Sequence, residues 1–447
     1  MLGIPLTLKE IAASVGGITH SNNIINYITT DSREIVDGDL FIALDGKRND
    51  GENYVYETIK KGAIPMSKSE YRNGITVVDT RAALLLLAEY YANRLENIRQ
   101  KIAITGSVGK TTTKEFLRVI LSKSYLTHAS YGNYNNEIGM PLSILSAPAN
   151  TEMLICELGM NHSGEIRKMA NVLRPDIAII TNIGSSHIGN LGSREAIAKA
   201  KLEICENMIN GVTLVPHSEP LLSSVNNAVT FSTSEADADF YLTNNEDKKI
   251  TIYNSGKKFL STDFIFNDAH LLTCLLIAVA AASLSGASAH NIKAGISEIS
   301  GENIRQNLIR CKNFNFYIDF YNSSAESLFA ALSSLNKLNN FPKKSALIGD
   351  ILELGEFAES IHYEIGRQIC KYNLHRLYLF GPLSKHIMKG ALKSNFPLER
   401  IFINDDVDAP SITVRQIREN SHADEVILMK ASRSLKLERI LNAFTND

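Results

Sequence analysis

Residues 102–115 read Ile-Ala-Ile-Thr-Gly-Ser-Val-Gly-Lys-Thr-Thr-Thr-Lys-Glu, and this stretch decides the fold. A short apolar run, a glycine turn and an amphipathic segment predict a strand, a loop and the start of a helix. Gly106 and Gly109 allow backbone amides to approach a phosphate, and the helix dipole adds to the attraction. Lys110 is placed to pair with outer phosphates, and the Thr111 hydroxyl to bind magnesium. The stretch therefore predicts a nucleotide site in an α/β protein.

The pattern is a shortened phosphate loop, Gly-x-x-Gly-Lys-Thr, because Ile104 stands where the longer pattern has glycine. Short glycine-lysine strings often arise by chance. Here an apolar stripe follows on the predicted helix and would hold it against a sheet. The stripe consists of Phe116, Leu117, Ile120 and Leu121. This setting favours the nucleotide interpretation over a chance match.

Composition limits the class of protein. The chain has 447 residues, which is too long for one compact core and predicts several domains. Its hydrophobic share is 44% and its charged share 21%, as in ordinary globular proteins. A formal net charge of −2 argues against nucleic acid as a partner, because polyanion binding normally needs a basic excess. Any anionic ligand must then be bound by local groups.

The cysteines and apolar runs point to a cytoplasmic protein. The five cysteines are widely spaced and form no Cys-x-x-Cys pair, which argues against a disulfide framework or structural zinc. The longest apolar run, at about 271–284, is too short to span a membrane and predicts a buried helix. The N-terminus lacks the pattern of a signal peptide.

Residues 1–99 predict a small α/β domain. We expect strands at 27–30, 40–44 and 75–78 and a helix at 81–95. Two polar loops follow strands, one containing Asp31, Ser32 and Arg33, the other Lys47. Each loop is explained by a capped turn, since Asp, Ser, Asn and Gly favour turns. The basic side chains of these loops also allow a second interpretation, a binding site for a ligand that carries a diphosphate group.

Residues 100–305 alternate strands, turns and helices, which predicts a mainly parallel sheet covered by helices. Ligands then bind at the carboxyl ends of the strands. Glu157 follows an apolar strand at 153–156 and is either a salt-bridged core residue or a cation ligand. His187 follows a predicted strand at 177–183 and is either a hydrogen-bonded loop residue or a ligand. A polar hairpin is expected at 243–258.

Lys201 lies on a predicted helix at 194–208. It falls on the apolar stripe of Ile197, Ile204 and Met208. Lys199 instead shares the polar side with Glu195, Glu203 and Glu206. Lys201 therefore points inward, either snorkelling to solvent or held as a desolvated amine of lowered pKa that can react with carbon dioxide.

Residues 306–447 predict a doubly wound, Rossmann-like domain after a hinge near 301–305. We expect strands at 316–320, 346–349, 377–380, 401–403 and 426–430. A helix at 323–338 should begin with a serine cap and carry Glu326 at its third position. Asp319, Asp350 and Lys430 stand at strand ends. Each suits a cap or surface pair, but together they suggest a ligand face.

Several longer stretches resemble the Mur ligases of bacterial cell-wall synthesis, over nearly the whole chain. They are Thr-Asp-Ser-Arg at 30–33, Gly-Asp-Leu-Phe-Ile-Ala-Leu-Asp-Gly at 38–46, Gly-Asn-Tyr-Asn-Asn-Glu-Ile-Gly-Met-Pro at 132–141, Glu-Leu-Gly-Met-Asn-His-Ser-Gly-Glu-Ile at 157–166, Gly-Asp-Ile-Leu-Glu-Leu-Gly-Glu at 349–356 and Lys-Ala-Ser-Arg-Ser-Leu-Lys-Leu-Glu-Arg at 430–439. The resemblance implies a UDP-binding N-terminal domain, a central ATPase domain and a C-terminal Rossmann-like domain. It is strongest for the branch that uses ATP to add D-alanyl-D-alanine to a UDP-N-acetylmuramoyl tripeptide.

The resemblance also implies roles for individual residues. The catalytic residues would be Lys110, His187, Lys201 and Arg305. ATP would contact Gly106, Ser107, Val108, Gly109, Lys110, Thr111, Thr112, Arg305, Asp319 and Asn322. Magnesium would be bound by Thr111, Glu157 and His187, with Lys201 carried as a carbamate. The substrates would contact Asp31, Ser32, Arg33, Lys47, Asn135, Asn136, Lys430, Ser432 and Arg433. We expect a monomer without a membrane span.

The chain departs from the family pattern near the adenine. A usual His-Asn-x-x-Asn appears as His270-Leu271-Leu272-Thr273-Cys274. Two alternatives to the ligase above therefore stay open: a sibling ligase with a different acceptor, and a nucleotide-binding paralogue that does not ligate.

Overall fold

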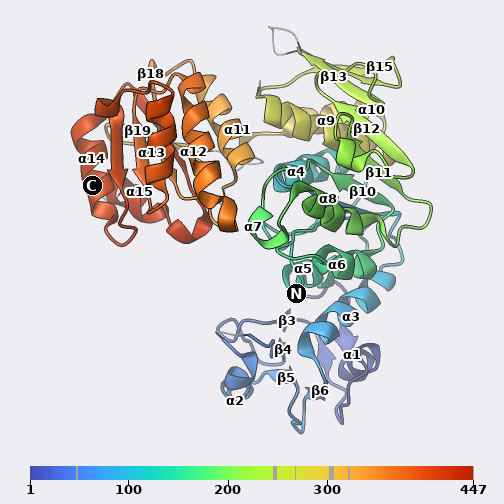
Figure 1. The fold of residues 1–447 in the computed structure, drawn as a ribbon. Helices are drawn as coiled ribbons and strands as arrows, with labels where there is room; N and C mark the ends of the chain where they lie inside the picture. Colours follow the sequence, from blue (N-terminus) through green and yellow to red (C-terminus); the bar gives the residue numbers. More distant parts are fainter. Residues whose placement is uncertain (47–48, 245–248, 267, 302–306, 321–322, 446–447) are drawn as a thin grey trace.

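The computed structural model describes residues 1–447 except 47–48, 245–248, 267, 302–306, 321–322 and 446–447. Three sheet-centred domains follow one another along the chain (Figure 1): the N-terminal domain in blue, the central domain in green and yellow, and the C-terminal domain in orange and red. The three-domain α/β class predicted from the sequence is confirmed.

The N-terminal domain contains a four-stranded parallel sheet of order β3-β4-β5-β6 and a two-stranded pair, β1-β2. Its elements are β1 (Leu6–Thr7), α1 (Leu8–Val15), β2 (Ile24–Ile25), β3 (Ile28–Thr29), β4 (Leu40–Ile42), α2 (Val55–Lys60), β5 (Ile64–Ser67), β6 (Ile75–Thr76) and α3 (Thr80–Asn93). The expected strands and helix are present. Strand β5 was not predicted, because it is short and contains Pro65, which disfavours a strand.

The central sheet has nine strands in the order β15-β14-β13-β12-β11-β10-β7-β9-β8; the β13–β14 and β14–β15 pairings are antiparallel and the other pairings are parallel. Its elements are β7 (Gln100–Thr105), α4 (Lys110–Leu121), β8 (Thr127–Ala129), α5 (Gly139–Leu145), β9 (Met153–Glu157), α6 (Glu165–Leu173), β10 (Ile177–Ile180), α7 (Ile188–Leu191), α8 (Arg194–Leu202), β11 (Val212–Pro216), β12 (Ala228–Ser232), β13 (Phe240–Asn244), β14 (Lys249–Asn254), β15 (Lys257–Asp263), α9 (Ala269–Leu284) and α10 (Ala289–Glu298). The mainly parallel sheet and the buried helix expected at 271–284 are confirmed.

Both faces of the central sheet are buried, which explains its continuous apolar strands. Ile102 and Ile104 of β7 pack into the core formed with α4 and α9, while Ala103 packs into the core on the opposite face. Successive side chains of a strand point to opposite faces, so both must be apolar where helices cover both sides.

The C-terminal domain has a six-stranded sheet of order β16-β17-β21-β18-β19-β20, in which β16 is antiparallel and the rest are parallel. Its elements are β16 (Asn307–Cys311), β17 (Phe314–Ile318), α11 (Ala325–Asn336), β18 (Lys343–Gly349), η5 (Gly355–Phe357), α12 (Ala358–Ile369), β19 (Leu377–Phe380), α13 (Ser384–Lys393), β20 (Ile401–Asn404), α14 (Pro410–Asn420), β21 (Glu425–Lys430) and α15 (Glu438–Thr445). Helix α11 begins one residue later than expected. Its cap is Ser324 with Ser327 as partner, so Glu326 is free to contact another domain.

Two expectations for the central domain were wrong. The helix predicted at 194–208 ends at Leu202 and tightens into a 3-10 turn, and this change of pitch turns Glu203 inward. Glu203 is buried and accepts hydrogen bonds from the backbone amides of Gly164 and Arg167, so it caps helix α6 instead of facing water. The strand predicted at 177–183 ends at Ile180.

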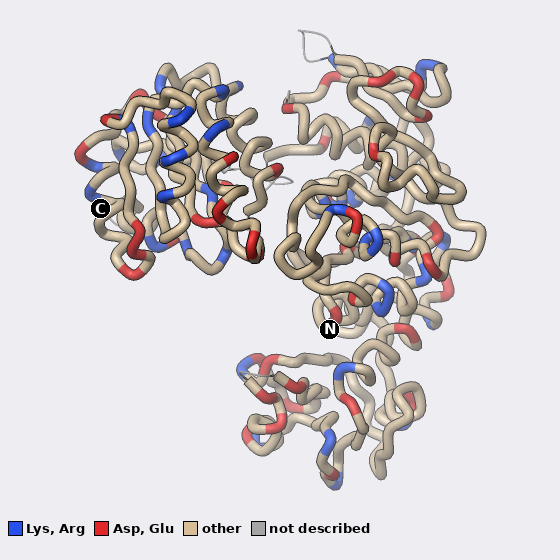
Figure 2. The backbone as a smooth tube through the Cα atoms, viewed as in Figure 1, with Lys and Arg blue, Asp and Glu red and all other residues tan. Residues whose placement is uncertain are grey.

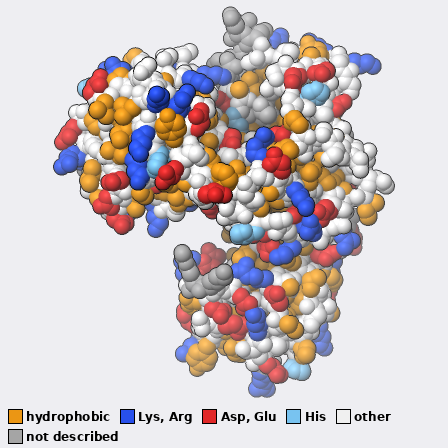
Figure 3. All heavy atoms as spheres, in the orientation of Figure 1, with side chains coloured by type: hydrophobic (Ala, Val, Ile, Leu, Met, Phe, Trp, Pro, Cys, Tyr) orange, Lys and Arg blue, Asp and Glu red, His pale blue; other side chains and the backbone are white. Residues whose placement is uncertain are grey.

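Charges and exposed apolar groups are dispersed over the surface. Figure 2 shows basic and acidic residues interspersed in all three domains, and Figure 3 shows hydrophobic side chains scattered over the visible face. Among the described residues, no helix is long and apolar enough to cross a bilayer.

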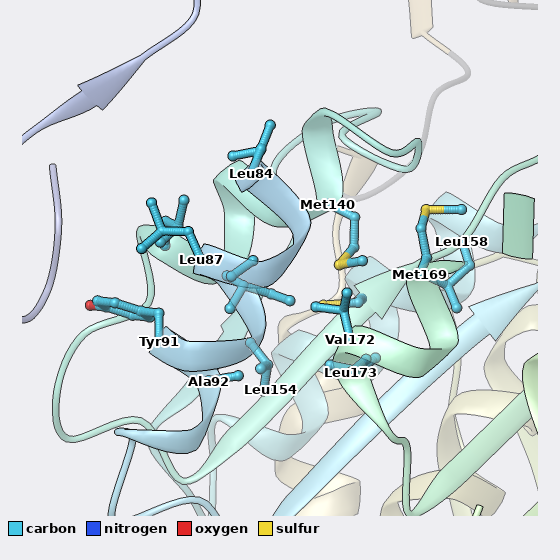
Figure 4. Packing of buried hydrophobic residues seen from close by; sticks show 14 of the residues in the cluster. Leu84, Leu87, Tyr91, Ala92, Met140, Leu154, Leu158, Met169, Val172 and Leu173 are labelled. Atoms are coloured by element: carbon cyan, nitrogen blue, oxygen red, sulfur yellow. The ribbon is translucent and has the colours of Figure 1, made fainter. Parts of the chain in front are cut away.

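Helix α3 joins the N-terminal domain to the central one. Figure 4 shows Ala92 of α3 next to Leu154 of β9, and Leu84, Leu87 and Tyr91 belong to the same buried apolar core. The Tyr91 ring is fully buried, and its hydroxyl donates to the carbonyl of Ala147 at 2.8 Å while accepting from the amide of Ile4 at 2.8 Å. One phenol therefore ties the N-terminal segment to the end of helix α5.

We expect Tyr91→Phe to lower the free energy of unfolding by about 1–3 kcal/mol, because it leaves buried backbone groups unpaired. Urea denaturation would measure this loss, with Tyr56→Phe as a control, since Tyr56 is 69% exposed. Equal stability of the two variants would contradict the bridging role.

Asp350 does not face the ligand side as we expected. Its carboxylate is 2% exposed and accepts from the amide of Leu383, ahead of helix α13, at 3.1 and 3.2 Å. Burial raises the pKa of Asp350 to about 6, with the amide hydrogen bonds opposing the shift. Asp350 is thus a buried helix-terminus residue.

The sign of this pKa shift predicts a pH effect. The protonated carboxyl contributes stability that is complete below the ordinary pKa of 3.8 and is lost as the pH rises through about 6. We therefore expect Asp350→Asn to raise the melting temperature relative to the parent more at pH 7.5 than at pH 5. Thermal unfolding at both pH values tests this, and a difference independent of pH would reject it.

Candidate active site

A cavity of about 690 Å³ is lined by residues of the central and C-terminal domains. It brings together most of the predicted site residues. These are Gly106, Ser107, Val108, Gly109, Lys110, Thr111, Thr112, Asn135, Asn136, Glu157, His187, Lys201, Asp319, Lys430, Ser432 and Arg433. The residues come from segments far apart in the sequence, so the cavity is a product of the domain arrangement.

The phosphate loop joins β7 to α4, as predicted. Gly106 has φ of 147° and Gly109 of 84°, conformations that favour glycine. A Cβ on Gly106 would lie 1.8 Å from the hydroxyl oxygen of Thr181, so the loop also needs glycine for close approach to the end of β10. The loop therefore has the backbone that the sequence pattern indicated.

In this conformation, hydrogen-bond donors of the phosphate loop bond to oxygen atoms of the protein itself. The amides of Ser107 and Val108 donate to Oδ1 of Asn182 at 2.9 and 3.0 Å. The ammonium of Lys110 donates to the carbonyl of Gly106 at 2.6 Å. The sequence did not identify Asn182 as a site residue, because it falls within the segment predicted as a strand. Its position just after the true end of β10, where ligands of parallel sheets bind, could have indicated it.

Glu157 stands at the end of β9, with a 2% exposed side chain. Its Oε2 accepts from the Thr111 hydroxyl at 2.6 Å, and its Oε1 accepts from the Asn135 amide at 2.7 Å. Both of these partners are neutral. A buried carboxylate held by neutral donors suits a cation ligand better than the salt-bridged core residue that we had kept as an alternative.

Lys114 is a further residue that the sequence reasoning missed. Its ammonium is fully buried and donates to the carbonyls of Ser130 and Gly132 at 2.5 and 2.9 Å. The Ser130 hydroxyl in turn accepts from the amide of Glu157 at 3.1 Å. Lys114 lies three residues before Leu117 on the apolar stripe of α4, the same signal that identified Lys201.

Lys201 points into the protein as predicted, with 2% exposure, whereas Lys199 is exposed. Burial lowers the pKa of Lys201 well below its usual 10.5, and the charge of Lys110 lowers it further. The snorkelling alternative is excluded by this burial. A buried amine of lowered pKa therefore lines the cavity together with the phosphate loop.

The C-terminal domain contributes one ion pair and several polar groups to the cavity. The Lys430 ammonium is 1% exposed and donates to Oδ2 of Asp319 at 2.9 Å. The Ser432 hydroxyl accepts from the amide of Leu352 at 2.9 Å. Arg433 is 59% exposed and pairs with Glu438 at 3.1 Å. Lys430 is thus held rigidly, and Arg433 lies on the rim.

Three predicted residues of the N-terminal domain are described by the structure and do not line the cavity. Asp31, Ser32 and Arg33 lie in a turn of the N-terminal domain, with Arg33 exposed and the other two half-buried, and Arg33 donates to Asp31 at 2.8 Å. Hydrogen bonds from Arg33 lower the pKa of Asp31 to about 2. Lys47, Arg305 and Asn322 lie outside the described residues.

The segment at 270–274, which departs from the family pattern, also lies in this region. His270 and Leu271 line the cavity, and the Cys274 thiol lies 3.8 Å from the carbonyl oxygen of Gly109. A Cβ on Gly109 would lie 3.1 Å from His270 Cε1 and 3.2 Å from Cys274 Sγ. Helix α9 therefore packs directly on the phosphate loop through these side chains.

In the described part of the chain, no three His, Cys, Asp or Glu side chains gather closely enough to hold a metal alone. Magnesium commonly uses one or two carboxylates and completes its shell with phosphate and water. Glu157 and Thr111 offer oxygen donors of that kind, so the arrangement suits magnesium together with a nucleotide.

Comparison with known proteins agrees with this geometry. Residues 104–282 match the model of the Mur ligase middle domain. The chain is 34% identical to the UDP-N-acetylmuramoyl-tripeptide--D-alanyl-D-alanine ligase of Bacillus subtilis, with 98% of both chains covered. It is 27% identical to the Escherichia coli protein of the same name, with the same coverage of both chains.

Solved structures show the same likeness over the full chain. The MurF structure from Acinetobacter baumannii superposes with a TM-score of 0.87 at 27% identity, covering 99% of both chains. The MurF ligase from Thermotoga maritima in complex with ADP gives 0.80 at 25% identity, covering 94% of this chain and 97% of that one. These relatives and structures match nearly the whole chain, and its interdomain cavity contains a phosphate loop, a buried lysine and a buried glutamate. This chain therefore belongs to the Mur ligase family.

Proposed function

We propose that this protein is an ATP-dependent amide ligase that adds D-alanyl-D-alanine to a UDP-N-acetylmuramoyl tripeptide. The observation that carries the proposal is the single cavity lined by Lys110, Glu157, His187 and Lys201. The relatives that match over nearly their whole length are named for this reaction, and a related structure was solved with ADP.

The reaction must activate a carboxylate before an amine can attack it. Transfer of the γ-phosphoryl group to the substrate carboxylate forms an acyl phosphate; the amine then attacks the acyl carbon and phosphate leaves. The task for the protein is positioning and charge stabilisation. Lys110 and the loop amides would exchange their present oxygens, those of Gly106 and Asn182, for phosphate oxygens.

Magnesium would be held by Thr111 and Glu157, with His187 beside a second ion. When bound, it supplies positive charge to the transferring phosphoryl group. Glu157 is oriented for this by Thr111 on one oxygen and Asn135 on the other. The protein thus presents a preformed carboxylate and keeps it buried.

Lys201 would act as a carbamate. A neutral amine reacts with carbon dioxide to give an N-carboxylate and a proton, and burial favours the neutral form of this amine. The product is an anion near the cation of Lys110, so the two charges balance. This accounts for a lysine on the inward face of α8.

The proposed roles of the three domains rest on the resemblance of their motifs to the Mur ligase family. We propose boundaries at 1–99, 100–305 and 306–447. The N-terminal domain would bind the UDP end with Asp31, Ser32, Arg33 and Lys47. Asn135 and Asn136 would face the peptide, and Lys430, Ser432 and Arg433 would bind substrate from the C-terminal side. Asp319, Asn322 and Arg305 would contact the nucleotide in a cytoplasmic, monomeric enzyme.

The first prediction concerns the product. Incubation with UDP-N-acetylmuramoyl tripeptide, D-alanyl-D-alanine, ATP and magnesium should release phosphate and yield the tripeptide substrate extended by the dipeptide. Mass spectrometry detects the product, and omission of either substrate should abolish phosphate release. Product formed only with a different amine would identify a sibling ligase, and undetectable turnover with intact ATP binding a paralogue that does not ligate.

The second prediction concerns the buried amine. Lys201→Ala should lower turnover by at least about a hundredfold, the scale typical of lost charge stabilisation. Added acetate or another short carboxylate should restore part of it, because it replaces the carbamate. Steady-state kinetics measures both effects, with Lys199→Ala as the matched control on the exposed face of the same helix. Near-normal rates in Lys201→Ala would remove Lys201 from the mechanism.

A further inference from the structure

The central and C-terminal domains meet closely at helix α7. The amide of Gly189 donates to the carbonyl of Glu353 at 3.1 Å. A Cβ on Gly189 would lie 2.3 Å from the Gly355 nitrogen, so only glycine allows this approach. Ile188 packs against the apolar core of the C-terminal domain. Figure 1 shows α7 at the side of the central domain that faces the C-terminal one. The backbones of the two domains are therefore in direct contact at this point.

A close contact between two polar side chains crosses this boundary. Nδ1 of His187 lies 2.7 Å from Oε2 of Glu353. The His187 side chain is 19% exposed and that of Glu353 is 50% exposed. The nearby His187 side chain lowers the pKa of Glu353, with burial opposing the shift. The pair lies at the cavity, because both residues are part of its lining.

Both partners have an unusual backbone. His187 and Glu353 each have φ of 64°, the left-handed region that non-glycine residues seldom adopt. Such conformations cost on the order of 1–3 kcal/mol and persist where surrounding contacts enforce them. Here the α7 contact enforces two of them on opposite sides of one domain boundary. The strain is thus located where the two side chains meet.

The geometry determines which ring nitrogen of His187 is available. A carboxylate on Nδ1 holds the proton there and leaves Nε2 as the nitrogen that can bind a cation. It also makes Nε2 a stronger donor. Since Glu353 belongs to the C-terminal domain and His187 to the central one, this effect exists only while the domains are docked.

We propose that Glu353 is a positioning residue that orients His187 for cation binding, so that docking of the C-terminal domain and completion of the metal site occur together. The proposal rests on the ligase function above, in which His187 lies beside a magnesium ion. It has a chemical benefit. An acyl phosphate hydrolyses in open water, and a metal site complete only in the docked state delays phosphoryl transfer until the cavity is closed.

Two substitutions test the pair. Glu353→Asn shortens the side chain and removes its carboxylate, and asparagine tolerates the left-handed backbone conformation. Glu353→Gln keeps an acceptor for Nδ1–H without the charge. Isothermal titration of magnesium into enzyme saturated with a non-hydrolysable ATP analogue should give a dissociation constant about 10–100-fold weaker for Glu353→Asn and an intermediate value for Glu353→Gln. This binding measurement needs no turnover.

Glu326 provides a matched control. It is another C-terminal carboxylate at the same boundary, and its Oε1 accepts from the amide of Ser185 at 2.6 Å. Glu326→Gln removes a charge at the boundary but keeps an oxygen that can accept from Ser185 and does not touch His187, so magnesium affinity should stay within about twofold of the parent. A loss equal to that of Glu353→Asn would reject a specific role for Glu353 and assign the effect to docking alone.

A double-mutant cycle completes the test. In a His187→Ala background, Glu353→Asn should cause no further loss of magnesium affinity, because it acts through the ring that has been removed. Additive losses, or unchanged affinity in Glu353→Asn alone, would overturn the proposal. Failure of the ligase assignment is separate: it would appear as a parent enzyme that forms no product, while the coupling in magnesium binding could still be measured.

Discussion

The site depends on one constraint, the alignment of three neighbouring parallel strands. Strands β10, β7 and β9 lie side by side, and parallel strands end at the same edge of a sheet. The phosphate loop follows β7, Glu157 ends β9, and the segment leading to His187 follows β10. A phosphate site, a carboxylate and an imidazole are thereby gathered without any long-range motif in the sequence.

Buried polar groups then hold this edge in a defined geometry. Thr111 and Lys114 on α4 bind Glu157 and the loop at 130–132, while Glu203 caps the helix that follows Glu157. Each buried charge has specific hydrogen-bond partners, as burial requires. Lys201 differs from these residues, because burial lowers the pKa of its amine and so disfavours the charged form. This contrast is the basis of the carbamate proposal for Lys201.

The second level of organisation is the boundary between the domains. The cavity has residues of both domains in its lining, and the pair of His187 with Glu353 joins them through strained backbones. An enzyme that makes a water-sensitive acyl phosphate benefits from a site assembled by docking, since chemistry then follows closure. The glycines at 189 and 355 permit the close contact on which this depends.

Local pattern by itself determined the three α/β domains, the phosphate loop and the inward direction of Lys201, because strand alternation and helix periodicity are written in neighbouring residues. The end of the helix at Leu202, the inward turn of Glu203 and the capping role of Asp350 were decided by tertiary contacts that periodicity does not contain. The partners of Glu157 and His187 were likewise invisible, since Asn135 and Glu353 approach them only when loops and domains pack together. Sequence thus specified which groups are present, and packing of distant segments specified which of them meet.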